Sequence, residues 1–279
     1  MNKIDISNEN FSNYTLDRDL DLLIDLDGIP KARYKWDHYK YDYLNINVPR
    51  VTSILSSTIG KEELKKWAAS LGDNYQYTMQ SILNTGTLVH SMIDDFILLG
   101  SRDAAYLGDQ YTNADLTQAD KAYNNFVNWW FEFHSKGCKI TPIAIEKSIT
   151  CPWYGGTADF IANISYPDGT NYNYILDFKT SKQIGFEYFL QTRMYMNAVN
   201  LNLSMGLEKE LPQIHGIGII RVDKIADTTQ FVAADIDHDF EFFMNLDYSI
   251  NSMLKWFYEQ ISIKSQVSAF KRLYKNREL

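Results

Sequence analysis

The sequence predicts a protein of the α/β class. Stretches rich in β-branched and aromatic residues, which favour strands, occur in the same chain as stretches whose apolar residues recur at helical spacing. The strand-like stretches gather in residues 140–236, and long helix-like ones lie before and after them. With 279 residues, 45% hydrophobic and 14% aromatic, the chain is long enough to bury a sizeable core.

The composition limits the kinds of protein that this chain can be. No run approaches the roughly 18 apolar residues of a membrane span, and the first residues lack the apolar region of a signal peptide. Cys138 and Cys151 are too few for a disulfide framework, a cysteine-only zinc site or an iron–sulfur cluster. We therefore expect a cytoplasmic protein with no membrane partner and no iron–sulfur cluster.

The charges are unevenly distributed. The net charge of −8 argues against broad, nonspecific DNA binding through a basic surface, but it allows a local basic groove. Residues 1–47 are expected to form a peripheral segment, in which the tyrosine-rich residues 33–47 could pair as strands. Residues 263–279 form a basic tail, which is either a solvated face or a contact with nucleic acid.

Residues 50–136 are expected to be largely helical. Apolar residues at helical spacing predict helices at residues 61–68, 87–97 and 117–136. His90 and Asp94 share a face of the second helix, so the carboxylate of Asp94 could orient the imidazole. A single histidine in a helix is, however, more often a packed or surface residue than a ligand.

Residues 142–149 alternate as a strand does. Isoleucines occupy one face, and Glu146 lies on the other. The strand leads directly into a hairpin that carries further acids, so Glu146 could reach the same site. An ordinary glutamate on the solvent face would fit the pattern equally well.

Two aspartates are expected to face each other across this hairpin. The turn at residues 166–170 contains Pro-Asp-Gly, which can reverse a strand. If the hairpin is symmetric about Asp168, Asp159 lies directly opposite Asp177, with Cβ atoms about 5 Å apart. Lys179 shares their face, because side chains alternate along a strand.

Such opposed carboxylates repel each other unless a cation lies between them. Mg²⁺ is typically held by one or two carboxylates together with substrate phosphates. An adjacent lysine could polarise a water or neutralise charge that develops on a phosphate. The alternative is an exposed hairpin with polar residues on its solvent side, and a bulge could shift the register by one residue.

The rest of the chain continues the mixture of helices and strands. Residues 186–199 are expected to form a helix, on which Gln191 and Tyr195 share one side. Both could hydrogen-bond a phosphate or brace a catalytic side chain, although a polar stripe facing solvent would look the same. The last expected elements are two strands and an aromatic-rich helix, at residues 214–222, 230–236 and 240–261.

Short motifs in a fixed order resemble those of the RecB-type branch of the PD-(D/E)XK nuclease superfamily. They are Gly86-Thr87-Leu88-Val89-His90, Glu146, Gly156-Thr157-Ala158-Asp159, Leu176-Asp177-Phe178-Lys179-Thr180, and Gln191 with Tyr195. The earlier Val51-Thr52-Ser53-Ile54-Leu55 is similar to a segment of phage-encoded exonucleases of that branch. Ala158 stands where the superfamily's name has proline, a departure that is frequent in this branch.

The resemblance implies a fold and an activity. The fold is a mixed central β-sheet flanked by helices, a restriction-endonuclease-like core, in a nuclease domain of residues 48–262 with its catalytic core at residues 140–236. The activity is Mg²⁺- or Mn²⁺-dependent hydrolysis of DNA phosphodiester bonds by an exonuclease of phage DNA replication, recombination or repair. The implied partners are single-stranded DNA or duplex ends, with a single-strand annealing or replication protein as a further candidate.

The resemblance also implies a role for each motif residue. The expected metal ligands are His90, Asp159, Asp177 and the backbone carbonyl of Phe178. The expected catalytic residues are Asp159, Asp177, Lys179 and Glu146. The expected substrate-binding residues are Thr180, Gln191 and Tyr195.

Other classes of function fit the same residues. The chain could be a catalytically idle DNA-binding or assembly protein that retains the nuclease fold, although intact Asp159, Asp177 and Lys179 argue against this. It could also be a structure-specific endonuclease or a nuclease directed at RNA. Incubation with linear and circular DNA, with and without Mg²⁺, distinguishes these activities.

Overall fold

The computed structural model describes residues 41–44, 46–59, 72–101 and 111–275. Its centre is a five-stranded sheet in the order β3-β4-β5-β6-β7. The strands are β3 (Lys139–Cys151), β4 (Tyr154–Ser165), β5 (Asn171–Lys179), β6 (Gly216–Val222) and β7 (Thr229–Asp235). Strands β5 and β6 run parallel and the other neighbouring pairs of this sheet run antiparallel, so the predicted mixed sheet is confirmed.

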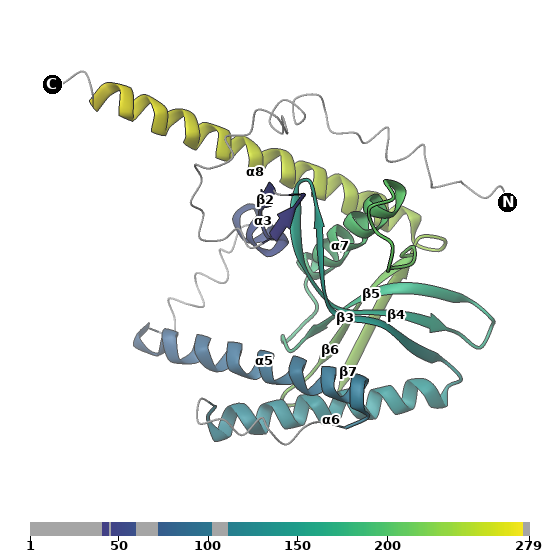
Figure 1. Ribbon diagram of the computed structural model, residues 1–279. Helices are drawn as coiled ribbons and strands as arrows, with labels where there is room; N and C mark the ends of the chain where they lie inside the picture. Colours follow the sequence, from purple (N-terminus) through teal and green to yellow (C-terminus); the bar gives the residue numbers. More distant parts are fainter. Residues whose placement is uncertain (1–40, 45, 60–71, 102–110, 276–279) are drawn as a thin grey trace.

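Helices cover both faces of the sheet (Figure 1). On one face, α5 (Tyr75–Leu99) and α6 (Asn113–Ser135) lie side by side, preceded by the short 3₁₀ turn η1 (Gly72–Asn74). On the other face lie α3 (Val51–Thr58), α7 (Phe186–Ser204) and α8 (Phe240–Lys275). The chain therefore has the predicted α/β architecture, in which a central sheet separates two layers of helices.

The alternation of side chains along each strand divides the core in two. Phe160 and Leu176 pair across β4 and β5 and pack with α5 and α6. Ile161 and Ile175, one residue further along, pack with α3, α7 and α8. All four are fully buried, as expected for strands whose two faces are both covered.

A buried carboxylate fixes α5 against α6. Asp115 and Thr112 form a capping box at the start of α6, in which each side chain accepts a hydrogen bond from the other residue's backbone N–H. The Asp115 carboxylate also accepts a hydrogen bond from Ser81 of α5. Ser81 and His90 are nine residues apart and lie on opposite sides of that helix. This contact therefore turns His90 away from α6.

A small strand pair lies over the β3–β4 hairpin. Strands β1 (Tyr41–Tyr43) and β2 (Ile46–Val48) are antiparallel, as expected for this tyrosine-rich segment. The hydroxyl of Tyr41 hydrogen-bonds that of Thr157 over 2.8 Å, and the N–H of Gly155 donates to the carbonyl of Pro49 over 2.9 Å. These contacts tie the start of the described chain to the end of the β3–β4 hairpin.

The other expected elements are present, mostly with longer bounds. The helix expected at residues 240–261 continues as α8 to Lys275, through most of the segment expected to form a separate basic tail. The expected helix at residues 61–68 and most of the peripheral segment lie outside the described residues. Among the helices that the structure describes, none is long and apolar enough to cross a membrane.

Substitution of Gly156 tests the packing of α7 on β4. A Cβ atom at Gly156 would come within 2.3 Å of the Tyr195 ring, so Gly156→Ala should lower the free energy of unfolding by about 1–3 kcal/mol. Gly86→Ala is the control, because a Cβ there meets only Thr180 Oγ1, at 3.9 Å, and alanine favours a helix by up to about 1 kcal/mol. Urea unfolding measures both variants, and equal stabilities would contradict this packing.

Candidate active site

The predicted register of the β4–β5 hairpin is confirmed. Its paired residues run from Ser165 opposite Asn171 to Phe160 opposite Leu176, which is a hairpin symmetric about residue 168. Asp159 and Asp177 are the next positions in this register, just beyond the last pair of the two strands. Asp177 also ion-pairs with Lys179, as expected for residues on one face of a strand.

Glu146 extends the row of acids onto β3. The flanking pairs, Ile145 with Phe160 and Lys147 with Ala158, place Glu146 opposite Asp159. Its backbone has a φ of 47°, in the left-handed region that a residue with a side chain seldom occupies. Strained backbone of this kind costs on the order of 1 kcal/mol and is concentrated at functional sites. The strain therefore favours a functional role for Glu146 over that of an ordinary solvent-facing glutamate.

The main chain of Phe178 is held by two side chains where β4 and β5 separate. The carboxylate of Asp159 accepts a hydrogen bond from the Phe178 N–H over 2.9 Å. The Phe178 carbonyl lies 3.0 Å from Nε2 of His90, on α5. A carbonyl only accepts, so Nε2 carries the proton, and the neutral ring then presents the lone pair of Nδ1. Nδ1 lies 3.6 Å from Oδ2 of Asp159.

Three of the predicted site residues come together as a possible metal centre. His90, Glu146 and Asp159 each offer one ligand atom, and these atoms all lie within 4.8 Å of one another. The side chains of His90 and Asp159 are 28% and 13% exposed and Glu146 is exposed, so solvent reaches the group. One nitrogen with several carboxylate oxygens suits Mg²⁺ or Mn²⁺ better than zinc. The donor set thus fits the metal that the motifs imply.

Asp177 and Lys179 form a separate, buried pair beside this group. Their side chains are 2% and 19% exposed, and their charged groups are in direct contact. Burial raises the pKa of Asp177 to about 6, although Lys179 opposes this shift. Burial lowers the pKa of Lys179, but the charges of Asp177 and Asp159 outweigh it and raise the pKa overall. Lys179 is therefore protonated at neutral pH.

Helix α7 supports the buried pair. Gln191 donates a hydrogen bond to Oδ1 of Asp177 over 3.1 Å, and its amide lies 3.4 Å from the hydroxyl of Tyr195. Gln191 therefore braces the Asp177 carboxylate directly, and Tyr195 contacts the Gln191 amide. Tyr188, one turn before Gln191, places its ring 4.9 Å from the Lys179 ammonium, a cation–π contact. The sequence analysis did not identify Tyr188, although its spacing from Gln191 on one helix was a usable signal.

Thr180 and Asp94 also lie near the site, the first against helix α5 and the second on it. Thr180 lies beside Gly86, on the segment that follows β5. Asp94 was expected to orient His90, but the imidazole instead bonds the Phe178 carbonyl. Oδ1 of Asp94 is buried, and no partner for it is found among the described residues. Burial and the nearby charge of Glu146 raise the pKa of Asp94 to about 7.

Similarity to known proteins is found among solved structures and not among sequence families. No protein-family model and no curated protein matches the chain. Among solved structures, it is similar to a phage related exonuclease from Haemophilus somnus 129PT, with 15% identity and a TM-score of 0.28. The alignment covers 81% of this chain and 97% of that one. The proposals below depend on the geometry of the site and not on this similarity.

The raised pKa of Asp94 predicts how the stability of the metal-free protein changes with pH. A carboxyl with a pKa near 3.8 in the unfolded chain and about 7 in the folded one binds its proton more tightly when folded. Stability should therefore fall as the pH rises from about 4 to 7, and Asp94→Asn should reduce that fall. Urea unfolding at pH 5 and pH 7.5, in the presence of a chelator, measures the free energy of unfolding at each pH. An equal fall in the parent and in Asp94→Asn would contradict the prediction.

Proposed function

We propose that this chain is a Mg²⁺- or Mn²⁺-dependent deoxyribonuclease that hydrolyses phosphodiester bonds from DNA ends. The observation that carries the proposal is the convergence of His90, Glu146 and Asp159 beside the buried pair of Asp177 and Lys179. These residues come from α5, β3, β4 and β5. A fold has no stability reason to gather these acids around a buried ion pair, since burying charges costs free energy.

In the proposed enzyme, His90, Glu146 and Asp159 hold the cation, with Asp177 and the Phe178 carbonyl as the neighbouring oxygen ligands. A bound Mg²⁺ or Mn²⁺ supplies Lewis-acid chemistry, which polarises a phosphate and lowers the pKa of a water. The hydrogen bond from His90 to the Phe178 carbonyl fixes the imidazole, as partners of metal-bound histidines commonly do.

Lys179 supplies the positive charge that hydrolysis of a phosphodiester requires. Negative charge develops on the phosphate oxygens as a water attacks, and a fixed, largely buried ammonium stabilises it strongly. Asp177 and the Tyr188 ring hold the ammonium from two sides. Gln191 in turn holds Asp177, so the position of the lysine is set by packed elements and not by solvent.

The exposure of the site residues suggests the direction of substrate entry. Glu146 is exposed, whereas Asp177 and Lys179 are largely buried. A phosphate that approaches from solvent would therefore meet the Glu146 side of the group first. Attack at strand ends, and so an exonuclease, is part of the activity that we propose. Action in phage replication, recombination or repair, alongside a single-strand annealing or replication protein, is the biological setting that we propose.

Replacement of Lys179 tests the catalytic assignment. Lys179→Ala removes the ammonium but keeps all cation ligands, so cleavage should fall on the order of 100-fold or more while Mn²⁺ still binds. Lys182→Ala, at an exposed lysine three residues away, is the matched control and should cleave like the parent. Calorimetric titration with Mn²⁺ and cleavage of end-labelled DNA measure the two properties. Near-parental cleavage by Lys179→Ala would sink the assignment.

A comparison of DNA topologies tests the dependence on ends. Linear DNA should be degraded in Mg²⁺, whereas circular single-stranded and circular duplex DNA of the same sequence should persist, because the proposed enzyme acts at strand ends. Gel analysis over time, with a chelator lane as the control, follows both substrates. If circles are cut as fast as linear DNA, the enzyme is an endonuclease, and if neither is cut, the chain is not a deoxyribonuclease.

A further inference from the structure

Lys179 lies where β5 leaves the sheet. On the side of β4 the backbone contacts of β5 end at Phe178, and on the other side the ladder with β6 ends at the pair of Lys179 and Arg221. The residues that follow, 180–185, form no helix or strand and lead into α7. Strand ends tend to fray, whereas a catalytic group has to be held to within about 0.5 Å. The position of Lys179 therefore depends on what holds the chain beyond the ladder.

The side chain of Arg221 holds the chain two residues beyond Lys179. Its Nη1 donates a hydrogen bond to the carbonyl of Ser181 over 3.0 Å. The same nitrogen donates to Oδ2 of Asp223 over 3.0 Å, and Nε donates to Oε1 of Gln230 over 2.7 Å. The Arg221 side chain is only 5% exposed. A guanidinium fixed by β7 and by the turn after β6 thus reaches across to the segment that follows β5.

The place of Arg221 in the sheet makes a role limited to packing improbable on energetic grounds. Paired residues of neighbouring strands share a face, so Arg221 stands beside Lys179, and like charges placed side by side destabilise a sheet. An apolar side chain would fill the position at less cost, as Ile217 and Ile219 do on the same face of β6. Arginine differs in its planar fork of donors, which bonds a carbonyl, a carboxylate and an amide oxygen together. The position therefore favours a residue that anchors backbone.

This anchor is itself fixed by helix α6. Asn125, on α6, donates hydrogen bonds to the carbonyls of Asp223 and Ala226, each over 2.7 Å. Hydrogen bonds from the N–H groups of Ala226 and Ile225 hold the pKa of Asp223 below its usual value, so its carboxylate is charged beside the guanidinium. The end of β5 is thereby tied, through one arginine, to a turn that is packed on a helix.

We propose that Arg221 is a positioning residue for Lys179, an inference that rests on the proposed nuclease function. By holding the Ser181 carbonyl, the guanidinium fixes the direction in which the chain leaves β5, and so the backbone from which the lysine extends. Asp177 and the Tyr188 ring hold the ammonium at the other end of the same side chain. The bonds of Arg221 go to protein groups, so it acts through Lys179 and not on the phosphate.

Replacement of Arg221 by lysine tests this role, because lysine keeps the positive charge but cannot reproduce the fork. In the metal-free protein, amide hydrogen exchange over residues 180–185 should rise on the order of tenfold, since one anchoring bond is lost. Mn²⁺ should bind as in the parent, because every proposed ligand remains. Cleavage of end-labelled DNA should lose about 10- to 100-fold in kcat with KM unchanged, because a shift of about 1 Å in a catalytic group can cost roughly 100-fold.

Arg193→Lys is the matched control. Arg193 is also a buried arginine whose fork bonds a carboxylate, that of Asp247, over 2.8 and 2.6 Å, but it ties α7 to α8. This variant should lose stability to urea and still show the kcat of the parent and its exchange over residues 180–185. Gln230→Ala is a milder test at an exposed position of β7. It removes one partner of the guanidinium, so exchange and kcat should change in the same direction as in Arg221→Lys, by less.

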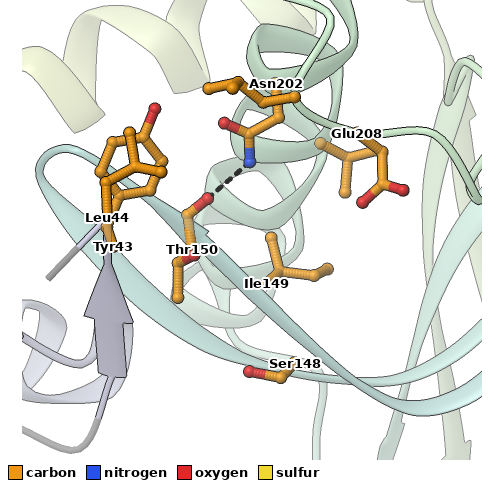
Figure 2. A pocket seen from close by; sticks show the side chains of 9 residues that line it. Tyr43, Leu44, Ser148, Ile149, Thr150, Asn202 and Glu208 are labelled. Atoms are coloured by element: carbon orange, nitrogen blue, oxygen red, sulfur yellow. Dashed lines mark hydrogen bonds between the residues drawn. The ribbon is translucent and has the colours of Figure 1, made fainter.

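A second control removes a bond of the same kind away from the site. A second cavity, apart from the candidate active site, lies between the tip of the β3–β4 hairpin, the strand pair β1–β2 and the end of α7 (Figure 2). At its edge, Asn202 donates a hydrogen bond to the carbonyl of Thr150 over 2.7 Å, about 13 Å along β3 from Glu146. Asn202→Ala should raise exchange near Thr150 and leave kcat and residues 180–185 unchanged.

The outcomes separate the two proposals. Parental kcat in Arg221→Lys overturns the positioning role, whether or not exchange rises, and so does an equal loss of kcat in Arg193→Lys. If Arg221→Lys does not fold, Gln230→Ala decides by the same two measurements. If the parent cleaves no DNA, the proposed nuclease fails. Exchange over residues 180–185 then decides by itself, because a rise in Arg221→Lys upholds the anchor and an unchanged rate overturns it.

Discussion

The backbone of Phe178 is the point on which the candidate active site depends. Asp159 holds its N–H, His90 holds its carbonyl, and its ring is buried against Phe126 and Phe160. These contacts join β4, β5, α5 and α6 at the place where the hairpin strands separate. The separation makes room between the acids, and the hydrogen bonds from side chains replace the ladder bonds that are lost there.

The buried pair of Asp177 and Lys179 shows that this site is built at a cost to stability. Removing two charges from water costs more free energy than a surface ion pair returns, and an apolar pair of similar size would be at least as stable. The fold compensates with Gln191, with the Tyr188 ring and with the large apolar core around Met194 and Leu190. Such an arrangement is typical of a site under selection for chemistry.

The two layers of helices contribute different residues to the candidate active site, from opposite faces of the sheet. Helix α5 brings His90 to the site from one face, while α7 brings Gln191 and Tyr188 from the other. The same β3–β4 hairpin carries Glu146 near its middle and borders the second cavity at its tip.

The sequence by itself determined the elements and the hairpin register. The Pro-Asp-Gly turn and the period of two predicted a hairpin symmetric about residue 168, with Asp159 and Asp177 at equivalent positions, because both are local properties of the chain. Only the tertiary structure decided that Phe178, and not Asp94, orients His90, and that Asp177 is buried against Lys179 while Glu146 stays exposed. It likewise brought Tyr43 and Asn202 to one cavity. These outcomes depend on how separate helices dock on the sheet, and no short sequence motif records the depth or the direction of such contacts.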